Sequence, residues 1–313
     1  MNYFYKFLCV SLIVAFSACT NTTVEQPHIV FVIGDEEYRS EESMPMLAHI
    51  AKRELNAKVT LCYSVDSLGY IDPNRTDHIQ GLEALETADL MVMFTRFRDL
   101  PDTELQHILS YAESGKPMVG FRTTTHAFLY KNDSTKTYMN NDWPTKVFGQ
   151  QWITHHGHFD DGERPLTAIN ISKEAHPVAK NIQPFDAYSW LYHVDGGDWK
   201  LYGDSDPFLE GTSLKSGHQQ NNRLDKFPMT NPVAWTKSYA GKNGISRVFF
   251  TTLGHPYDWK NENMRRLALN GIYWALGKDI PNELNVDFAT TYNPNNSGFG
   301  TKYKQGKLPL VIE

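Results

Sequence analysis

The chain has only three cysteines among its 313 residues, and this scarcity excludes a fold held together by internal disulfide bonds. Cys9 and Cys19 lie in an N-terminal stretch that we expect to be removed or modified, which leaves Cys62 as the single thiol of the folded part. Cys62 stands in a strand-like apolar run, where a buried packing role is more common than a nucleophilic one. Stability must therefore come from a hydrophobic core, and a hydrophobic content of 41% allows a large one.

The sequence also lacks runs of basic residues, and its formal net charge is -6. A protein that binds nucleic acid normally carries a basic patch or stripe, so nucleic acid is not expected as a partner. Aromatic residues are plentiful, at 13% of the chain. Sugar rings bind by stacking their C–H faces on aromatic side chains, so this content favours a carbohydrate ligand.

Residues 1–18 have the order of features that marks an export signal: a single positive charge, an apolar run over 7–16, and small residues directly before Cys19. The run is too short to span a bilayer as a mature helix. The position of Cys19 predicts that it is lipidated, followed by a tether over residues 19–27. The protein would then be exported and anchored by lipid to a bacterial membrane, on its periplasmic or cell-surface side. The alternative is an ordinary secretory signal, because Phe16 replaces the usual leucine of the lipidation pattern.

Apolar runs alternate with helical patterns in the first 121 residues. Strands are expected at 28–33, 59–63, 89–94 and 116–121, with helices carrying Met44 to Leu55, 82–85 and 102–114 between them. Continuous apolar strands separated by helices predict an open, mostly parallel α/β sheet with helices on both faces.

The second half of the chain has a different character. Residues 130–229 are rich in Gly, Asp, Asn and aromatic residues, which predicts an insertion of short antiparallel strands and loops. Regular structure returns with strands at 232–235 and 246–251 and a helix at 263–276. We therefore predict one domain over 28–277 and an irregular tail over 278–313, packed on the domain because it retains apolar residues.

Polar side chains directly follow three of the predicted parallel strands. They are Asp35, Glu36, Glu37 and Arg39 after the first strand, Arg96 after the third, and Arg122, Thr123 and His126 after the fourth. Ligands of open parallel sheets bind at the carboxyl ends of the strands, so the three groups are expected to meet on one rim. The alternative for each group alone is an ordinary exposed surface, because charged residues are mostly exposed.

Residues 120–123 occupy the strand-to-helix position at which hydrolase-type sheets carry a nucleophile. The chain has no cysteine and no Gly-x-Ser-x-Gly motif there, which disfavours covalent acyl transfer. Arg122 can hold an oxyanion or a hydroxyl group, and His126 can act as an acid or a base. Polarising and proton-moving roles are therefore expected for these two residues.

Three histidines lie within four residues, at His155, His156 and His158. Alternate side chains of an extended segment share a face, so His156 and His158 should point one way and His155 the other. One reading gives these histidines acid–base or substrate-binding roles, in which His156 or His158 moves a proton and His155 flanks the pair. Two alternatives stay open: a divalent metal on this pair with further ligands such as His126, Glu37 or His255, and a purely structural cluster.

Several motifs together resemble the trehalose-utilisation (ThuA-like) family over about residues 28–277. They are Val32–Ser40, Gly120–Phe128, Trp152–His158, His176–Pro177, Pro232–Thr236, Arg247–His255 and Trp274–Gly277. The resemblance implies a flavodoxin-like sheet of the class I glutamine-amidotransferase-like superfamily, without the cysteine chemistry of true amidotransferases. It also implies a role in disaccharide catabolism through 3-keto sugar intermediates. The chain departs from the family pattern at Arg122, where histidine is usual, and at Ser189, where an acidic residue is usual.

We therefore expect an enzyme that acts on a 3-keto-glycoside or related sugar by acid–base chemistry, as a hydrolase, lyase or isomerase. The expected catalytic residues are Arg122, His126, His156 and His158, and the expected substrate-binding residues are Asp35, Glu36, Glu37, Arg39, Arg96, Thr123, Trp152, His155 and His255. A small carbohydrate and, through the lipid anchor, a membrane are the expected partners, and the oligomeric state is open. No cofactor is predicted apart from the optional metal. The alternatives are a sugar-binding lipoprotein without activity and a metal-dependent sugar hydrolase.

Overall fold

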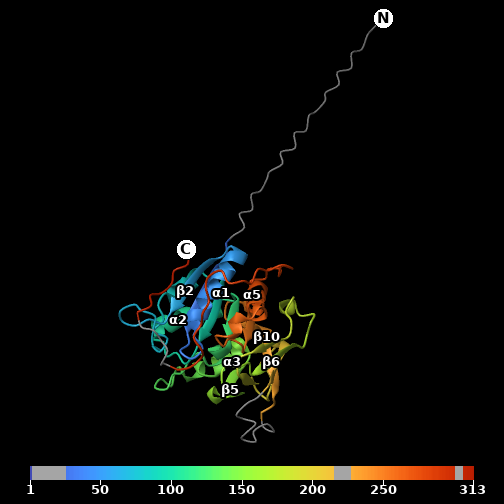
Figure 1. Ribbon diagram of the computed structural model, residues 1–313. Coiled ribbons are helices and arrows are strands. Elements are labelled where there is room, and N and C mark those ends of the chain that lie inside the picture. The colour runs from blue at the N-terminus through green and yellow to red at the C-terminus, as the bar shows by residue number, and fades with distance from the viewer. Residues whose placement is uncertain (2–25, 215–226, 300–305) are drawn as a thin grey trace.

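The computed structural model describes residues 1, 26–214, 227–299 and 306–313 (Figure 1). The predicted export signal, Cys19 and most of the predicted tether lie outside these residues. Within the described part of the chain, no helix is long and apolar enough to cross a membrane.

The described residues form a central sheet of nine strands, in the order β2-β1-β3-β4-β11-β10-β9-β6-β7. Its parallel half consists of β1 (His28–Gly34), β2 (Lys58–Tyr63), β3 (Leu90–Thr95), β4 (Met118–Phe121) and β11 (Ile245–Thr251). Every residue of β1, β3 and β4 is buried, because helices cover both faces of these strands. The predicted α/β fold with an open, mostly parallel sheet is confirmed.

The other half of the sheet is antiparallel, as predicted for the insertion. It is formed by β10 (Thr230–Ala240), β9 (Asp206–Ser213), β6 (Thr167–Ile171) and β7 (Phe185–Ala187). A separate two-stranded sheet pairs β5 (Gln151–His156) with β8 (Leu191–Asp195). The pairing of β10 with β9 slips between Pro232 and Trp235, at a proline that cannot donate a ladder hydrogen bond.

Helices cover the two faces of the sheet with separate core clusters. Among the described residues, the α-helices are α1 (Ser40–Leu55), α2 (Asp102–Glu113), α3 (Asp142–Phe148) and α5 (Glu262–Ala275). The 3-10 helices are η1 (Leu82–Thr87), η2 (Arg122–His126), η3 (Thr137–Met139), η4 (Phe159–Asp161), η5 (Pro177–Ala179) and η6 (Asp258–Lys260). Helices α1 and α5 contact each other on one face, where Leu47 and Leu267 join one cluster (Figure 1). Helices α2 and α3 cover the other face, with Ile108 and Phe148 in the second cluster.

After α5 the chain returns across the domain without regular structure in its described residues (Figure 1). Asn295 donates its backbone N–H to Glu42 Oε2 at 2.9 Å, beside the start of α1. Further along, the carbonyl oxygen of Lys307 accepts a hydrogen bond of 2.8 Å from the backbone N–H of Ile71. The tail thus runs past α1 towards the β2 side of the sheet and brings residues near 297–299 over the rim.

Gly271 provides a test of the packing between α5 and the sheet. A Cβ atom added at this position would lie 2.1 Å from Phe249 Cδ1 on β11, which is far inside normal contact distance. We expect Gly271→Ala to lower the free energy of unfolding by about 1–3 kcal/mol, because the overlap outweighs the better helix propensity of alanine. Urea unfolding measures the change. Arg266→Ala on the same helix is the control, with an expected change within about 0.5 kcal/mol. Equal stability of the two variants would contradict this packing.

Candidate active site

A cavity of about 250 Å³ lies at the carboxyl ends of the parallel strands. Its walls come from the segments that follow β1, β3 and β4, from the two-stranded sheet with the segments beside it, and from the tail. The lining residues are Glu37, Tyr38, Arg96, Phe97, His126, Trp152, His155, His158, Phe159, Trp190, Tyr192 and Phe299. Since ligand pockets usually measure about 300–1,000 Å³, this volume suits a ligand with one ring.

Glu37 and Arg96 form the charged wall of this cavity. Arg96 Nε lies 3.0 Å from Glu37 Oε2, and the same guanidinium also pairs with Glu36. Glu37 is only 5% exposed, and its burial raises the pKa of the carboxyl group to about 7, although the Arg96 cation opposes the rise. A carboxyl group with a pKa near neutrality can both take up and release a proton, which general acid–base catalysis requires.

His126 lies beside this pair as an uncharged group. Its ring packs between Phe97, at 5.1 Å, and Trp152, at 5.2 Å between ring centroids. Burial holds the pKa of His126 well below its usual value, and the nearby Arg96 guanidinium adds to the effect. Nδ1 lies 3.0 Å from Thr125 Oγ1, so Nε2 is the ring nitrogen left for a ligand among the described contacts. His126 can therefore hydrogen-bond to a ligand without adding charge.

Asp35 organises the segment that carries Glu37 and does not line the cavity. Its Oδ1 accepts hydrogen bonds of 2.7 Å from the backbone N–H groups of Glu37 and Tyr38. Its Oδ2 accepts a hydrogen bond from the hydroxyl of Thr123, at the end of β4. The structure thus places Asp35 and Thr123, both predicted to bind substrate, behind the wall, where they fix the position of Glu37.

Arg122, which was predicted to be catalytic, also lies behind the cavity and does not line it. Its φ of 44° gives the left-handed turn expected of a nucleophile elbow, but its side chain is fully buried. The guanidinium donates to the carbonyl oxygens of Thr252 at 2.8 Å and Trp190 at 3.3 Å, and to the Tyr38 hydroxyl at 2.9 Å. It lies over the ring of Tyr38 at 4.0 Å and over that of Tyr192 at 4.4 Å. These contacts hold the side chain beneath the aromatic wall.

Arg39 and His255, two further predicted substrate-binding residues, instead hold the tail. Arg39 Nη2 donates to the carbonyl oxygen of Gly298 at 3.1 Å. His255 Nδ1 accepts from the backbone N–H of Tyr257 at 3.1 Å, so its Nε2 carries the hydrogen and donates to Ser297 Oγ at 2.9 Å. Both side chains are used in these contacts, and neither lines the cavity.

The prediction for the histidine block was wrong about which side chains share a face. β5 ends at His156, and Gly157 with a φ of 110° then turns the chain. His155 and His158 therefore both line the cavity, whereas His156 Nε2 lies 2.9 Å from the carbonyl oxygen of Phe227, away from it. The alternation rule failed because the segment is not extended through Gly157.

This arrangement also bears on the metal alternative. His156 and His158 do not offer the shared face that a metal on this pair requires. In the part of the chain that the structure describes, no group of three or more His, Cys, Asp or Glu residues could hold a metal ion.

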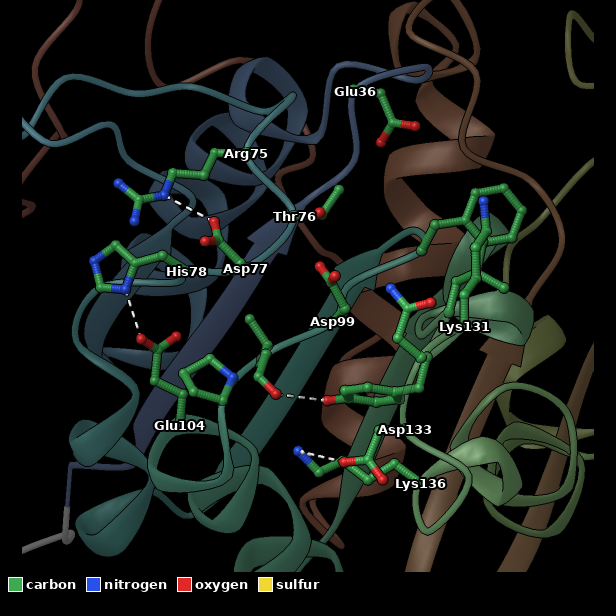
Figure 2. Close-up of a pocket in the computed structure, with 16 residues that line it drawn as sticks. Glu36, Arg75, Thr76, Asp77, His78, Asp99, Glu104, Lys131, Asp133 and Lys136 are labelled. Atoms are coloured by element: carbon green, nitrogen blue, oxygen red, sulfur yellow. Dashed lines mark hydrogen bonds and ion pairs between the residues drawn. The ribbon is translucent and has the colours of Figure 1, made fainter.

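A larger cavity of about 780 Å³ lies on the other side of Phe97, and Glu36 lines it (Figure 2). Glu36, predicted to bind substrate at the rim, is held there by Arg96 and by Arg98, whose Nη2 donates to it at 2.8 Å. Figure 2 shows an ion pair of Arg75 with Asp77 at 2.9 Å and a hydrogen bond between His78 Nδ1 and Glu104 Oε1 at 2.6 Å along this wall. The smaller cavity combines an aromatic lining with Glu37, whose pKa is raised to about 7, and with His126, so we take it as the candidate active site.

The model of the family described as ThuA, trehalose utilisation, matches residues 40–275. The chain belongs to the ThuA family. Two crystal structures described as putative ThuA-like proteins, from Bacteroides uniformis ATCC 8492 and Parabacteroides merdae ATCC 43184, are similar to it, each with a TM-score of 0.53. They are 16% and 17% identical to this chain and cover 81% and 82% of it and 92% of their own lengths, which supports a common fold alone. A comparison with curated proteins finds no match.

In this ThuA family member, the aromatic wall of the cavity was largely missed by sequence reasoning. The residues not anticipated are Tyr38, Phe97, Phe159, Trp190, Tyr192 and Phe299. Tyr38 and Phe97 could have been suspected, because each lies within or beside a polar rim motif. Trp190 and Phe299 had no local signal, since they come from the insertion and the tail. They join the wall through Phe159, whose ring centroid lies 4.7 Å from that of Trp190 and 5.8 Å from that of Phe299.

The contacts of Arg122 predict that lysine cannot replace it. A single ammonium group cannot reach three acceptors in different directions or cover two aromatic rings, and it would leave buried oxygens unpaired. We expect Arg122→Lys to lower the free energy of unfolding by about 2 kcal/mol or more, measured by urea unfolding. Arg75→Lys, in an ion pair with the exposed Asp77, is the matched control and should change the free energy of unfolding by less than about 0.5 kcal/mol. A variant at residue 122 as stable as this control would show that the buried contacts are dispensable.

Proposed function

We propose that this ThuA family member is an enzyme that moves a proton on a sugar, a 3-keto-glycoside or a related keto sugar, bound in the 250 Å³ cavity. The observation that carries this proposal is Glu37, a buried carboxyl group whose pKa is raised to about 7 at the cavity wall. A protein that only binds sugar has no need of a proton-transfer group poised at neutrality.

The walls of the cavity support a sugar as the ligand. Trp152, Trp190 and Tyr192 offer ring faces and edges on which the C–H groups of a pyranose can pack. His155 stands among them, with its ring centroid 4.6 Å from that of Trp190. Aromatic faces combined with a few polar groups suit a neutral, hydroxylated ring, and the association of the family with trehalose utilisation agrees with this class.

The chemistry follows from the acidity of a C–H group next to a ketone. When Glu37 removes this proton, the electron pair of the broken C–H bond moves into the carbonyl group and gives an enolate. The Arg96 cation beside Glu37 stabilises the developing negative charge, and the neutral His126 donates or accepts a hydrogen bond at a substrate oxygen. Return of the proton to a different atom isomerises the sugar, whereas loss of the group on the neighbouring carbon cleaves a glycosidic bond.

Replacement of the Glu37 carboxyl group tests this proposal. We expect Glu37→Gln to reduce turnover of a panel of 3-keto-glycosides and 3-keto-disaccharides by about 100-fold or more while sugar binding persists. Since the base must be ionised, kcat/KM of the wild type should rise with pH through about 7, and this rise should be absent in the variant. Chromatography of the sugars and calorimetric binding measure the two effects.

Glu104→Gln is the matched control, because Glu104 lines only the larger cavity in Figure 2. It should leave turnover unchanged. Wild-type protein that binds the sugars and returns them all unconverted would favour the sugar-binding alternative. Turnover that survives in Glu37→Gln would remove the assigned base.

We further propose that the protein is exported and lipidated at Cys19, as the order of charge, apolar run and small residues in 1–18 indicates. Labelling of expressing cells with an alkyne-tagged palmitate should attach the tag to the wild type and not to Cys19→Ser. Cys62→Ser is the matched control and should retain the label, because the Cys62 thiol is buried. Equal labelling of wild type and Cys19→Ser would exclude lipidation at this residue.

A further inference from the structure

A third cavity, of about 630 Å³, lies between β9, β10 and the turn that follows β8. Its lining residues are His193, Trp199, Lys200, Leu201, Ser205, Pro207, Pro228, Thr230, Asn231 and Pro232. Adjacent side chains of a strand point to opposite faces. Tyr192 on β8 therefore lines the candidate active site, while its neighbour His193 lines the 630 Å³ cavity. The two cavities thus lie on opposite faces of the two-stranded sheet.

His193 is a buried polar residue of this lining. It is 3% exposed, and neither of its ring nitrogens has a hydrogen-bond partner among the residues described. Burial lowers the pKa of His193, so the ring is neutral, with one nitrogen a donor and the other an acceptor. A buried polar group left unpaired costs about 1–3 kcal/mol. A ligand hydroxyl both donates and accepts, and it would satisfy this ring.

Trp199, next to His193, forms an exposed part of the lining. Its side chain is 60% exposed, and its ring centroid lies 4.9 Å from that of His193. Asp198 and Trp199 have φ values of 53° and 59°, a left-handed conformation that side-chain-bearing residues rarely adopt. The Asp195 carboxylate holds the turn by accepting from the backbone N–H groups of Gly197 at 2.8 Å and Trp199 at 3.3 Å. Strained backbone that presents an exposed aromatic ring is characteristic of a binding site.

The rest of the lining is largely apolar or uncharged. Pro207 and Pro232 come from the neighbouring strands β9 and β10 at the place where their pairing slips, so the sheet is irregular beside the cavity. Among the described residues of the lining, Lys200, which is exposed, is the single ionised side chain, and none is a carboxylate. These walls favour a neutral ligand with one flat apolar face and hydroxyl groups at its edge.

We propose that this cavity is a second carbohydrate site, which binds a neutral sugar ring with its C–H face on Trp199 and a hydroxyl group on His193. The site is separate from the cavity at Glu37 and needs no chemistry there. It would hold a second sugar unit or a second sugar molecule on the opposite face of the two-stranded sheet.

Saturation-transfer NMR on the full chain tests this site with methyl glucosides, galactosides and mannosides of both anomers and with trehalose. Trp152→Ala removes an aromatic wall of the first cavity, so sugar binding that persists in this background reports on the second. In that background, Trp199→Ala and His193→Phe should each weaken binding of at least one of these sugars by about tenfold or more. Tyr202→Ala, an exposed aromatic of the same turn that does not line the cavity, should leave binding unchanged.

The melting temperature of His193→Phe separates binding from folding. Phenylalanine has a similar shape and removes two unpaired nitrogens, so this variant should be at least as stable as the wild type while it loses the sugar. Absence of any sugar binding that depends on Trp199 and His193 overturns the proposal. A clear fall in melting temperature overturns it too, because it assigns His193 to the fold. Neither result bears on Glu37, whose role rests on turnover.

Discussion

The buried guanidinium of Arg122 is the interaction on which the candidate active site depends. Removing a cation from water costs several kcal/mol unless hydrogen bonds and neighbouring charges or dipoles replace the lost hydration. Here three hydrogen bonds from Nη1 and Nη2 and the faces of Tyr38 and Tyr192 replace part of it, while Nε has no hydrogen-bond partner among the described residues. The partners come from segments after β1, before and within β8, and after β11, so one side chain joins the parallel sheet to the two-stranded sheet. The elbow that holds a nucleophile in hydrolase-type sheets here holds a structural cation.

Burial of the rim residues also determines which of them can exchange protons near neutral pH. Burial raises the pKa of Glu37, while the cations Arg96 and Arg122 oppose the rise, and the balance lies at about 7. His126 responds in the opposite direction, because burial and these same cations all disfavour an imidazolium. One environment therefore produces a carboxyl group that titrates near neutrality and a histidine that stays uncharged. In acid–base active sites, the environment commonly shifts the pKa values of neighbouring groups apart, so that each group can take a different role.

The sequence predicted the elements whose signal is local. The buried parallel strands show as continuous apolar runs, and the meeting of Glu37, Arg96 and His126 follows from strands that end on one rim. The directions of side chains were not predictable in this way. The Arg122 side chain points beneath the aromatic wall because it donates hydrogen bonds to Tyr38 and Thr252 there. These residues are far from Arg122 in the sequence, so no local pattern predicts the contacts.

In the histidine block, the single residue Gly157 breaks the alternation of side chains that holds along an extended strand. A Cβ atom at Gly157 would lie 2.6 Å from Trp190 Cδ1, so the close approach of the indole and the left-handed φ both require glycine there. That turn carries His158 back to the side of His155. β8 is regular, and strict alternation applies to it: Tyr192 and His193 face different cavities. A register shift of one residue would exchange them and expose the Arg122 cation. The pairing of His155 with Tyr192 across the two strands therefore fixes both cavities at once.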